Sequence, residues 1–389
     1  MAQELIFNKS VAIVGAGPAG CICAKFLLDN GVIPTIFDKG KCLRTILPTG
    51  GGRCNLAHSE FDFKELSKNY PRGEKFLYSA FSKFGTKETL NFFKSIGIET
   101  YVQDDNRIFP KSNSSKEVQE KLLKSIRKCN FVQEEVSLVE KLDNCFKITT
   151  NKSKYAFDVV VLAIGGHSNF EILKPLDIKI EKPVQALVGL VTKEDFSDIS
   201  GVSLKSVKLK GKELKNIGEG DIIFTHKGIS GPLMYKISSV FARKEKPYKI
   251  SLQILKELNL QELLDKNSHK EIKNLLGQFV PKSFASWLLR NLEIPEDTPC
   301  HKINGKTRDK ILNKLLTFEI TITGNVPDGE VVTCGGINLK EINPTTMESR
   351  KYKGLYFCGE VMDIDGFCGG FNLQNCWSTG FVVSQSIIQ

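Results

Sequence analysis

The chain has 389 residues, of which 41% are hydrophobic, and a formal net charge of +10 that comes mostly from lysines spread along it. This length predicts two or three domains, and without a run of about 18 apolar residues no transmembrane helix is expected. The eleven cysteines form no CxxC pair and the five histidines have no metal-ligand spacing, so we expect free thiols and no metal site. Residues 1–7 are too short and too acidic for a signal peptide, which favours a cytoplasmic protein.

The first predicted element is an apolar strand over residues 11–14, which runs into the glycine-rich turn Gly15–Gly20. In a dinucleotide-binding turn, the first glycine permits the tight turn, the second lets the backbone approach the pyrophosphate, and the third lets the helix pack on the strand. A helix beginning near Pro18 would direct its N–H groups and positive dipole end at the phosphates. The predicted contacts are Gly15, Gly17, Pro18, Ala19 and Gly20.

A second strand is predicted over Thr35–Phe37, and it ends in Asp38. An acid at this position, 18 residues after Gly20, is typical of a group that accepts hydrogen bonds from the adenosine ribose. We assign Asp38 and the adjacent Lys39 to the cofactor site. The alternative, an ordinary glycine-rich turn between a strand and a helix, leaves the acid unexplained.

The middle of the chain alternates between helical and strand-like periodicity. Residues 47–55 form a loop that is too rich in glycine for the interior of a helix or strand. We predict helices over residues 75–84, 87–96 and 114–128, strands within 131–162, a strand-rich block over 183–231, a helical block over 256–316 and a strand over 318–323.

Two further glycine-rich segments follow predicted strands. The strand over Phe157–Leu162 runs into Ala163, Gly165 and Gly166, where the backbone could again approach a dinucleotide. Near the C-terminus, residues 354–358 run into Gly359 and Glu360 and then into a glycine-rich stretch over 366–372. An extended FAD molecule must be held at its ADP end and again along its ribityl and flavin end. We therefore predict a discontinuous nucleotide-binding domain with an inserted middle block.

Several collinear motifs support this prediction: Thr49–Asn55 (TGGGRCN), Phe224–Pro232 (FTHKGISGP), Val332–Ile337 (VTCGGI), Thr346–Ser349 (TMES) and Gly354–Gly380. With them the chain resembles the BaiN/YhiN-like family of FAD-dependent oxidoreductases, the aminoacetone oxidase-like flavoproteins. The resemblance implies an α/β fold: a discontinuous Rossmann-like FAD-binding domain of the two-dinucleotide-binding type, with an inserted β-rich domain and a helical domain nested within that. The expected bounds are 1–184 with 328–389, 185–254 with 317–327, and 255–316.

The resemblance also implies roles near the flavin. Glu360 should accept from a ribityl hydroxyl, while the N–H of Gly359 approaches the phosphates. The last helix, from about Phe371 to Ile388, should direct its N-terminus at the pyrimidine edge of the flavin. The backbone of Val136 should meet the adenine. The other residues assigned to this end are Asp365, Gly369, Gly370, Asn372 and Leu373.

The TGGGRCN loop should lie along the cofactor and contribute Gly51, Gly52, Arg53, Cys54 and Asn55. Arg53 has three alternatives: pairing with the pyrophosphate, holding a substrate carboxylate, or forming a structural salt bridge. No second cysteine follows Cys54 within residues 55–59, so a dithiol relay is not expected and a packed thiol is favoured.

His226 and Arg53 are the catalytic candidates. His226 lies in the FTHKGISGP motif, where it would be a general acid or, alternatively, a histidine that stabilises its loop through a backbone hydrogen bond. His167, Asp363 and Asp365 are weaker candidates. The stretch after Gly166 is shorter than is usual in the family, which bears on substrate preference and activity.

The predicted function is hydride transfer between flavin N5 and a small organic substrate. Without a second GxGxxG motif, NADH or NADPH would dock directly over the flavin if it is the donor. A tRNA-modifying flavoprotein and a non-catalytic FAD-binding redox sensor are the alternatives. Nucleic acid and membrane partners are not expected, and the sequence leaves the oligomeric state open.

Overall fold

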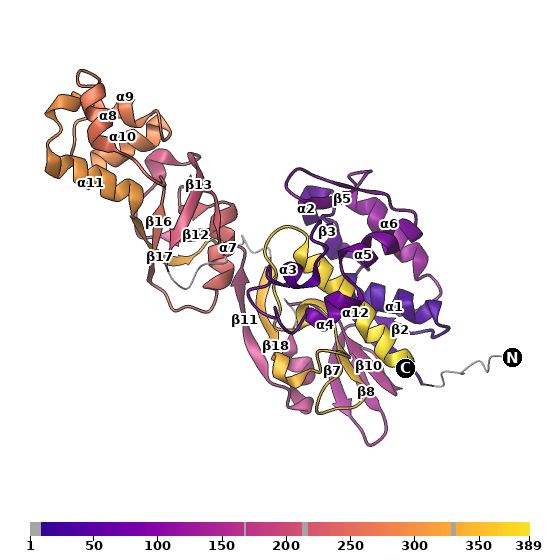
Figure 1. The fold of residues 1–389 in the computed structure, drawn as a ribbon. Coiled ribbons are helices and arrows are strands. Elements are labelled where there is room, and N and C mark those ends of the chain that lie inside the picture. The colour runs from indigo at the N-terminus through magenta and orange to yellow at the C-terminus, as the bar shows by residue number, and fades with distance from the viewer. Residues whose placement is uncertain (1–8, 167–168, 212–216, 328–331) are drawn as a thin grey trace. The chain divides into compact units, whose positions relative to one another are not determined.

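The computed structural model describes residues 9–166, 169–211, 217–327 and 332–389. The chain divides into two compact units, unit 1 (Met1–Val184 with Val332–Gln389) and unit 2 (Gln185–Val331). Both the indigo N-terminal and the yellow C-terminal segments of Figure 1 belong to unit 1. The three-domain division expected from the sequence stays a prediction.

A five-stranded parallel sheet forms the centre of unit 1, in the order β19-β10-β1-β2-β6. Two of its strands are apolar and buried along their whole length, as is typical of parallel strands covered on both faces. The register pairs Val14 with Leu162 and Leu162 with Phe357, so three strands end side by side. The strands are β1 (Val11–Val14), β2 (Thr35–Phe37), β6 (Asn130–Val132), β10 (Val159–Leu162) and β19 (Leu355–Phe357).

Helix α12 (Phe371–Ile388) packs against α1 (Pro18–Asp29), as Figure 1 shows. The two backbones approach closely at Gly380, where an added Cβ would lie 2.5 Å from the carbonyl oxygen of Ala19. The expected range of the last helix agrees with α12. The last helix of the chain thus holds the helix that follows the first glycine-rich turn.

Smaller elements surround this core. Gly50 and Gly51 in the TGGGRCN segment have φ of 58° and 69°, so the short helical turn α2 contains left-handed residues that glycine adopts without strain. The remaining elements of unit 1 are α2 (Thr49–Gly52), β3 (Ala57–His58), α3 (Phe63–Ser67), α4 (Tyr78–Lys83), α5 (Thr86–Ser95), β4 (Thr100–Val102), β5 (Arg107–Pro110), α6 (Ser115–Ser125), β7 (Val136–Lys141), β8 (Phe146–Thr150), β9 (Lys154–Phe157) and β18 (Val332–Ile337), with 3₁₀ turns η1 (Arg44–Ile46), η2 (Phe170–Leu176), η6 (Leu339–Glu341) and η7 (Gly359–Val361). Strand β11 (Ile180–Ala186) begins in unit 1 and ends in unit 2.

Unit 2 contains a closed barrel in the order β12-β15-β14-β13-β16-β17. The barrel and the helices share one hydrophobic core, in which the rings of Phe196 and Trp287 are 5.3 Å apart and those of Phe224 and Phe284 are 5.6 Å apart. Its elements are β12 (Leu190–Thr192), β13 (Ser203–Lys210), β14 (Glu219–Thr225), β15 (Gly228–Ser230), α7 (Pro232–Val240), β16 (Tyr248–Gln253), α8 (Leu260–Lys266), α9 (Ile272–Leu276), α10 (Lys282–Asn291), α11 (Gly305–Leu316) and β17 (Phe318–Asn325), with 3₁₀ turns η3 (Ser197–Ile199) and η5 (Cys300–Lys302).

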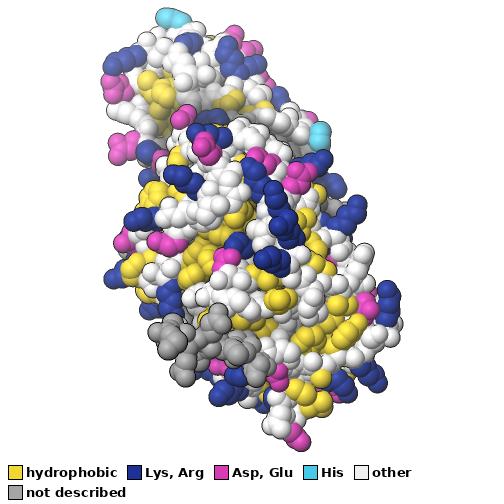
Figure 2. All heavy atoms as spheres, turned by 90° about the vertical axis from the view of Figure 1, so that its right-hand side faces the viewer, with side chains coloured by type: hydrophobic (Ala, Val, Ile, Leu, Met, Phe, Trp, Pro, Cys, Tyr) yellow, Lys and Arg dark blue, Asp and Glu magenta, His cyan; other side chains and the backbone are white. Residues whose placement is uncertain are grey.

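Lysine and arginine side chains are interspersed with acidic and apolar ones on the face shown in Figure 2, as their spacing in the sequence indicates. Within the described part of the chain, no helix has the length and apolar composition that crossing a membrane requires.

Gly380→Ala tests the packing of α12 on α1. The new methyl group would collide with Ala19 and Ile22, so we expect a loss of about 1–3 kcal/mol in the free energy of unfolding, measured by denaturant titration. Gly305→Ala is the matched control, because the closest protein atom would be 3.9 Å away, on the side chain of Arg308. Equal stability of the two variants would contradict the close packing.

Candidate dinucleotide-binding site

The turn between β1 and α1 has the geometry that its glycines predict. Gly15 has φ of 108°, and an added Cβ would lie 2.7 Å from the carbonyl carbon of Ala163. A Cβ on Gly20 would collide with the carbonyl oxygen of Gly15. Gly17 differs from both, because a Cβ there would meet no protein atom within 4 Å. Of the three glycines in this turn, only Gly17 therefore has open space next to its backbone.

The N-terminus of α1 is not neutralised by the protein. Gly17 caps the helix without a side-chain hydrogen bond, Pro18 occupies the first turn, and no acidic residue lies in that turn. Free N–H groups and the positive end of the helix dipole favour an anion at this position. The pyrophosphate of FAD fits this helix end.

Asp38 lies at the end of β2 with both carboxylate oxygens in use. One oxygen accepts from the N–H of Ala16 and the other from the N–H of Gly40, each at 2.8 Å. These bonds fix the carboxylate at the edge of the turn and leave further lone pairs for hydroxyl donors. Lys39 forms an exposed ion pair with Glu135 at 2.9 Å. The ribose contact of Asp38 and a cofactor contact of Lys39 remain predictions.

The TGGGRCN loop presents two open glycines and one cation. Gly51 and Gly52 are exposed, and an added Cβ on either would meet no protein atom within 4 Å. The guanidinium carbon of Arg53 lies 4.1 Å from the centroid of the Phe109 ring, and its Nε donates to the carbonyl of Gly50 at 3.2 Å. Among the described residues Arg53 has no ion-pair partner, so the structural salt bridge considered for it is not formed.

Three residues assigned to the cofactor are used inside the protein instead. Cys54 is fully buried and burial raises the pKa of its thiol to about 12, so the expectation of a packed thiol is confirmed and a cofactor contact of the side chain is wrong. Asp365 is fully buried and pairs with Arg72 through both oxygens, which also excludes a direct contact. The amide group of Asn55 lies 2.9 Å from the N–H of Gly370, and its oxygen accepts from that group once the amide is turned so that its nitrogen donates to Ala57 and Ile108.

The start of α12 is therefore held by the TGGGRCN loop. Gly369 and Gly370 have φ of 140° and 93°, and α12 begins without a side-chain cap or an acid in its first turn. Asn372 clamps the preceding loop, because its amide both donates to and accepts from the backbone of Gly366 at 2.8 Å. Leu373 is half-buried in the same turn.

The other residues predicted to contact the cofactor are either accessible or already occupied by packing within the protein. Gly165 is open, since a Cβ there would meet no protein atom within 4 Å, and Glu360 is half-exposed in η7. The N–H of Gly359 instead donates to Thr379 Oγ1 at 2.9 Å, which corrects the expectation that it faces a phosphate. The second group is set by packing within the protein: the N–H of Ala163 donates to Val14, a Cβ on Gly166 would lie 2.8 Å from Thr333, and Val136 pairs with Thr150 in β7 and β8.

His226 lies in unit 2, in the exposed turn between β14 and β15. Its ring makes no hydrogen bond to another described residue, so the alternative of a loop-stabilising histidine is wrong. Its role as a general acid stays a prediction. Asp363 is buried in unit 1, and His167 lies outside the described residues.

His58 is the residue at this site that the sequence analysis did not identify. Its Nδ1 lies 3.2 Å from the carbonyl oxygen of Gly369, and its ring packs on Phe371 with centroids 4.7 Å apart. A carbonyl only accepts, so Nδ1 carries the proton and the neutral ring has its lone pair on Nε2. Burial lowers the pKa of His58, although the bond to Gly369 opposes this effect. The signal in the sequence was a histidine three residues after the TGGGRCN motif.

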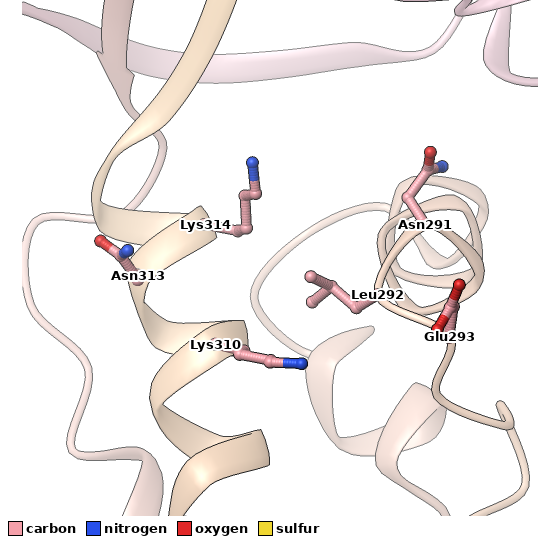
Figure 3. Close-up of a pocket in the computed structure, with 6 residues that line it drawn as sticks. All are labelled: Asn291, Leu292, Glu293, Lys310, Asn313 and Lys314. Carbon is pink, nitrogen blue, oxygen red and sulfur yellow. The ribbon is translucent and has the colours of Figure 1, made fainter.

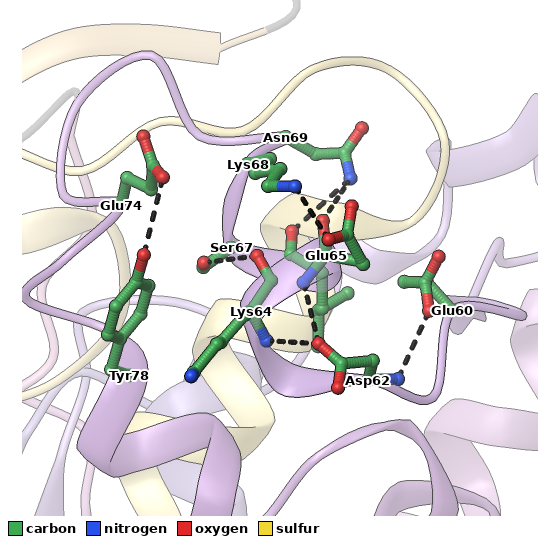
Figure 4. Close-up of polar contacts among 10 residues, drawn as sticks. Glu60, Asp62, Lys64, Glu65, Ser67, Lys68, Asn69, Glu74 and Tyr78 are labelled. Carbon is green, nitrogen blue, oxygen red and sulfur yellow. Dashed lines mark hydrogen bonds and ion pairs between the residues drawn. The ribbon is translucent and has the colours of Figure 1, made fainter.

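Residues 62–70, which follow His58 in the chain, also help to hold the start of α12 in place. Asp62 caps α3 by accepting from the N–H groups of Lys64 and Glu65 at 2.9 and 3.0 Å, as Figure 4 shows. These bonds lower the pKa of Asp62. Tyr70 follows, and its hydroxyl donates to the carbonyl of Phe371 at 2.6 Å.

The pocket in Figure 3 is separate from these residues. It has a volume of about 300 Å³ and lies in unit 2 between the end of α10 and α11, where Lys310 points toward Leu292 and Glu293. None of the predicted cofactor contacts lines it. Over the described ranges, no group of three or more His, Cys, Asp or Glu side chains could hold a metal ion.

Comparison with known proteins identifies the family of the chain and its fold. Residues 9–386 match the family model described as HI0933-like protein Rossmann domain. The chain is 27% identical to a ribosomal RNA dihydrouridine synthase of Escherichia coli K12, over 97% of each chain. It is 28% identical to a 3-dehydro-bile acid delta(4,6)-reductase of Clostridium scindens, over 97% of this chain and 98% of the relative.

A solved 3-ketosteroid delta1-dehydrogenase from Sterolibacterium denitrificans has the same fold, with a TM-score of 0.50 and 11% identity over 98% of this chain and 99% of that one. The predicted α/β Rossmann fold is confirmed, as is the resemblance stated from the motifs. The chain belongs to the HI0933-like family, a family of FAD-dependent oxidoreductases.

Proposed function

We propose that the protein is an FAD-dependent reductase that adds a hydride and a proton across a carbon–carbon double bond conjugated with a carbonyl group. The observation that carries this proposal is its similarity, over 97% of the chain, to two relatives whose names both denote such a reduction. In one the double bond belongs to a pyrimidine base, and in the other to a steroid ring. The shared chemistry supports the reaction class, whereas the small-molecule substrate itself stays open.

In this proposal the N-terminus of α1 binds the pyrophosphate and Asp38 binds the adenosine ribose. The open backbone at Gly17 and Gly165 allows close approach, and Glu360 receives a ribityl hydroxyl. The N-terminus of α12 stabilises negative charge on the pyrimidine edge by about 0.5–1 kcal/mol. Bound and reduced FAD supplies the hydride.

We propose NADH or NADPH as the source of electrons. The sequence has no second GxGxxG motif for a separate nicotinamide domain, so the donor would bind in the space that the substrate later takes. The nucleotide and the substrate would then bind in turn at the same position.

Gly17→Val tests the cofactor site. The new side chain would enter open space, so we expect a folded protein whose molar FAD content, measured by absorbance after denaturation, falls about tenfold or more. Glu360→Ala should also lose FAD. Gly305→Val, the same substitution at the start of α11, is the control and should keep it. A full FAD content in both Gly17→Val and Glu360→Ala would overturn the site.

Anaerobic mixing with NADH and with NADPH tests the reaction. We expect one of them to bleach the flavin absorbance, and a neutral conjugated enone such as 2-cyclohexenone to restore it. Restoration by oxygen alone, with no enone active, would contradict the reductase proposal and favour an oxidase. A flavin that dithionite reduces but neither nucleotide does would favour a redox sensor.

RNA is a second candidate substrate, favoured by the net charge of +10 and by the name of the Escherichia coli relative. Lysine contacts to phosphates release counterions, so RNA binding should weaken by about tenfold or more between about 50 and 200 mM salt. Fluorescence anisotropy with a labelled ribosomal RNA fragment measures this. Binding that is absent or insensitive to salt would remove RNA as a candidate.

A further inference from the structure

The small sheet β3-β5-β4 in unit 1 carries a cluster of cationic and aromatic side chains. His58 and Arg107 are paired across β3 and β5. The ring of Phe109, two residues along β5, is 5.6 Å from the guanidinium carbon of Arg107 and 4.1 Å from that of Arg53. Side chains two residues apart on a strand share a face, so these groups gather on one side of the sheet.

Arg53 is the cation in this cluster that lacks a counterion. Arg107 is paired with exposed Asp105 at 2.6 Å. Arg53 is half-buried on the aromatic ring, and among the described residues only its Nε has an acceptor, the carbonyl of Gly50. Stacking on an aromatic face keeps a guanidinium in place and leaves its terminal N–H groups directed outward. A fixed arginine fork with free donors matches the oxygens of a carboxylate or phosphate.

The cluster adjoins the part of unit 1 assigned to the flavin. His58 contacts the carbonyl of Gly369 directly before α12, and Asn55, two residues after Arg53, holds the N–H of Gly370. The pyrophosphate of FAD has its own anion site at the start of α1, which is free of any acid. Arg53 is therefore available to a different anion, on the substrate.

We propose that Arg53, supported by Phe109 and flanked by Arg107 and His58, forms a subsite for an oxyanion carried by the substrate. This inference rests on the proposed function and narrows it. The substrate would be a conjugated carbonyl compound with a carboxylate or a phosphate group, oriented by the arginine fork. Because neutral His58 has only a lone pair at Nε2, the donors to the oxyanion come from the arginines and not from this ring.

Isothermal titration of the FAD-loaded protein with succinate and, separately, with inorganic phosphate tests the subsite. We expect wild type to bind at least one of them, and Arg53→Gln to weaken that binding about tenfold or more while keeping its FAD. Preference for succinate would indicate a carboxylate substrate, and preference for phosphate a phosphorylated one. Arg53→Lys should recover part of the affinity, because it restores the charge without the fork.

Arg127→Gln is the matched control, since it removes the same charge from an exposed position after α6 and should bind as wild type does. Arg107→Gln provides a second variant of the cluster and should weaken binding by a smaller factor. Binding by Arg53→Gln equal to wild type, or no binding by wild type, would overturn the subsite. Loss of FAD from Arg53→Gln would also overturn it, by placing the guanidinium on the cofactor. Because no turnover is measured, these outcomes are independent of flavin reduction by nucleotides.

Discussion

The close contact between the first and last helices of unit 1 is the constraint on which the site depends. Gly380 lets α12 reach the backbone of α1 at Ala19, and Gly359 accepts the same proximity, since a Cβ there would lie 2.8 Å from that alanine. This contact brings the last helix of the 389-residue chain against its first helix. Helix α1 then starts directly after β1, at the strand ends where α/β sheets bind ligands.

The N-termini of the two helices carry no neutralising acid, whereas the buried carboxylate near them is already paired. Neither α1 nor α12 has an acid in its first turn, so their dipoles remain available to an anion or to a reduced flavin. The carboxylate of Asp365, by contrast, is fully buried and pairs with Arg72, whose side chain is 15% exposed. A buried pair of this kind stabilises the fold little in net terms, although removing one partner would leave a costly unpaired charge.

The sequence located the turn residues of the site but misjudged several side chains. Gly15, Gly17 and Asp38 could be placed because a tight turn, a close approach and a strand-end acid each demand a particular residue at a particular spacing. Cys54 and Asp365 were misassigned because their neighbours along the chain are glycine-rich. Their burial depends on Thr49, Arg72 and other packing partners that no local pattern identifies. His58 was missed because its partner Gly369 is more than 300 residues away.

By itself the sequence determined the α/β class, the parallel strands around the first turn and the C-terminal helix, since hydrophobic periodicity and glycine spacing are local properties. The tertiary structure decided which polar groups stay free. It assigned the N–H of Gly359 to Thr379 and the amide of Asn55 to Gly370, and it left the Arg53 guanidinium on Phe109 without an acid. Hydrogen bonds and ion pairs between distant segments make that selection, because a polar group is available to a ligand only where the fold has not already satisfied it.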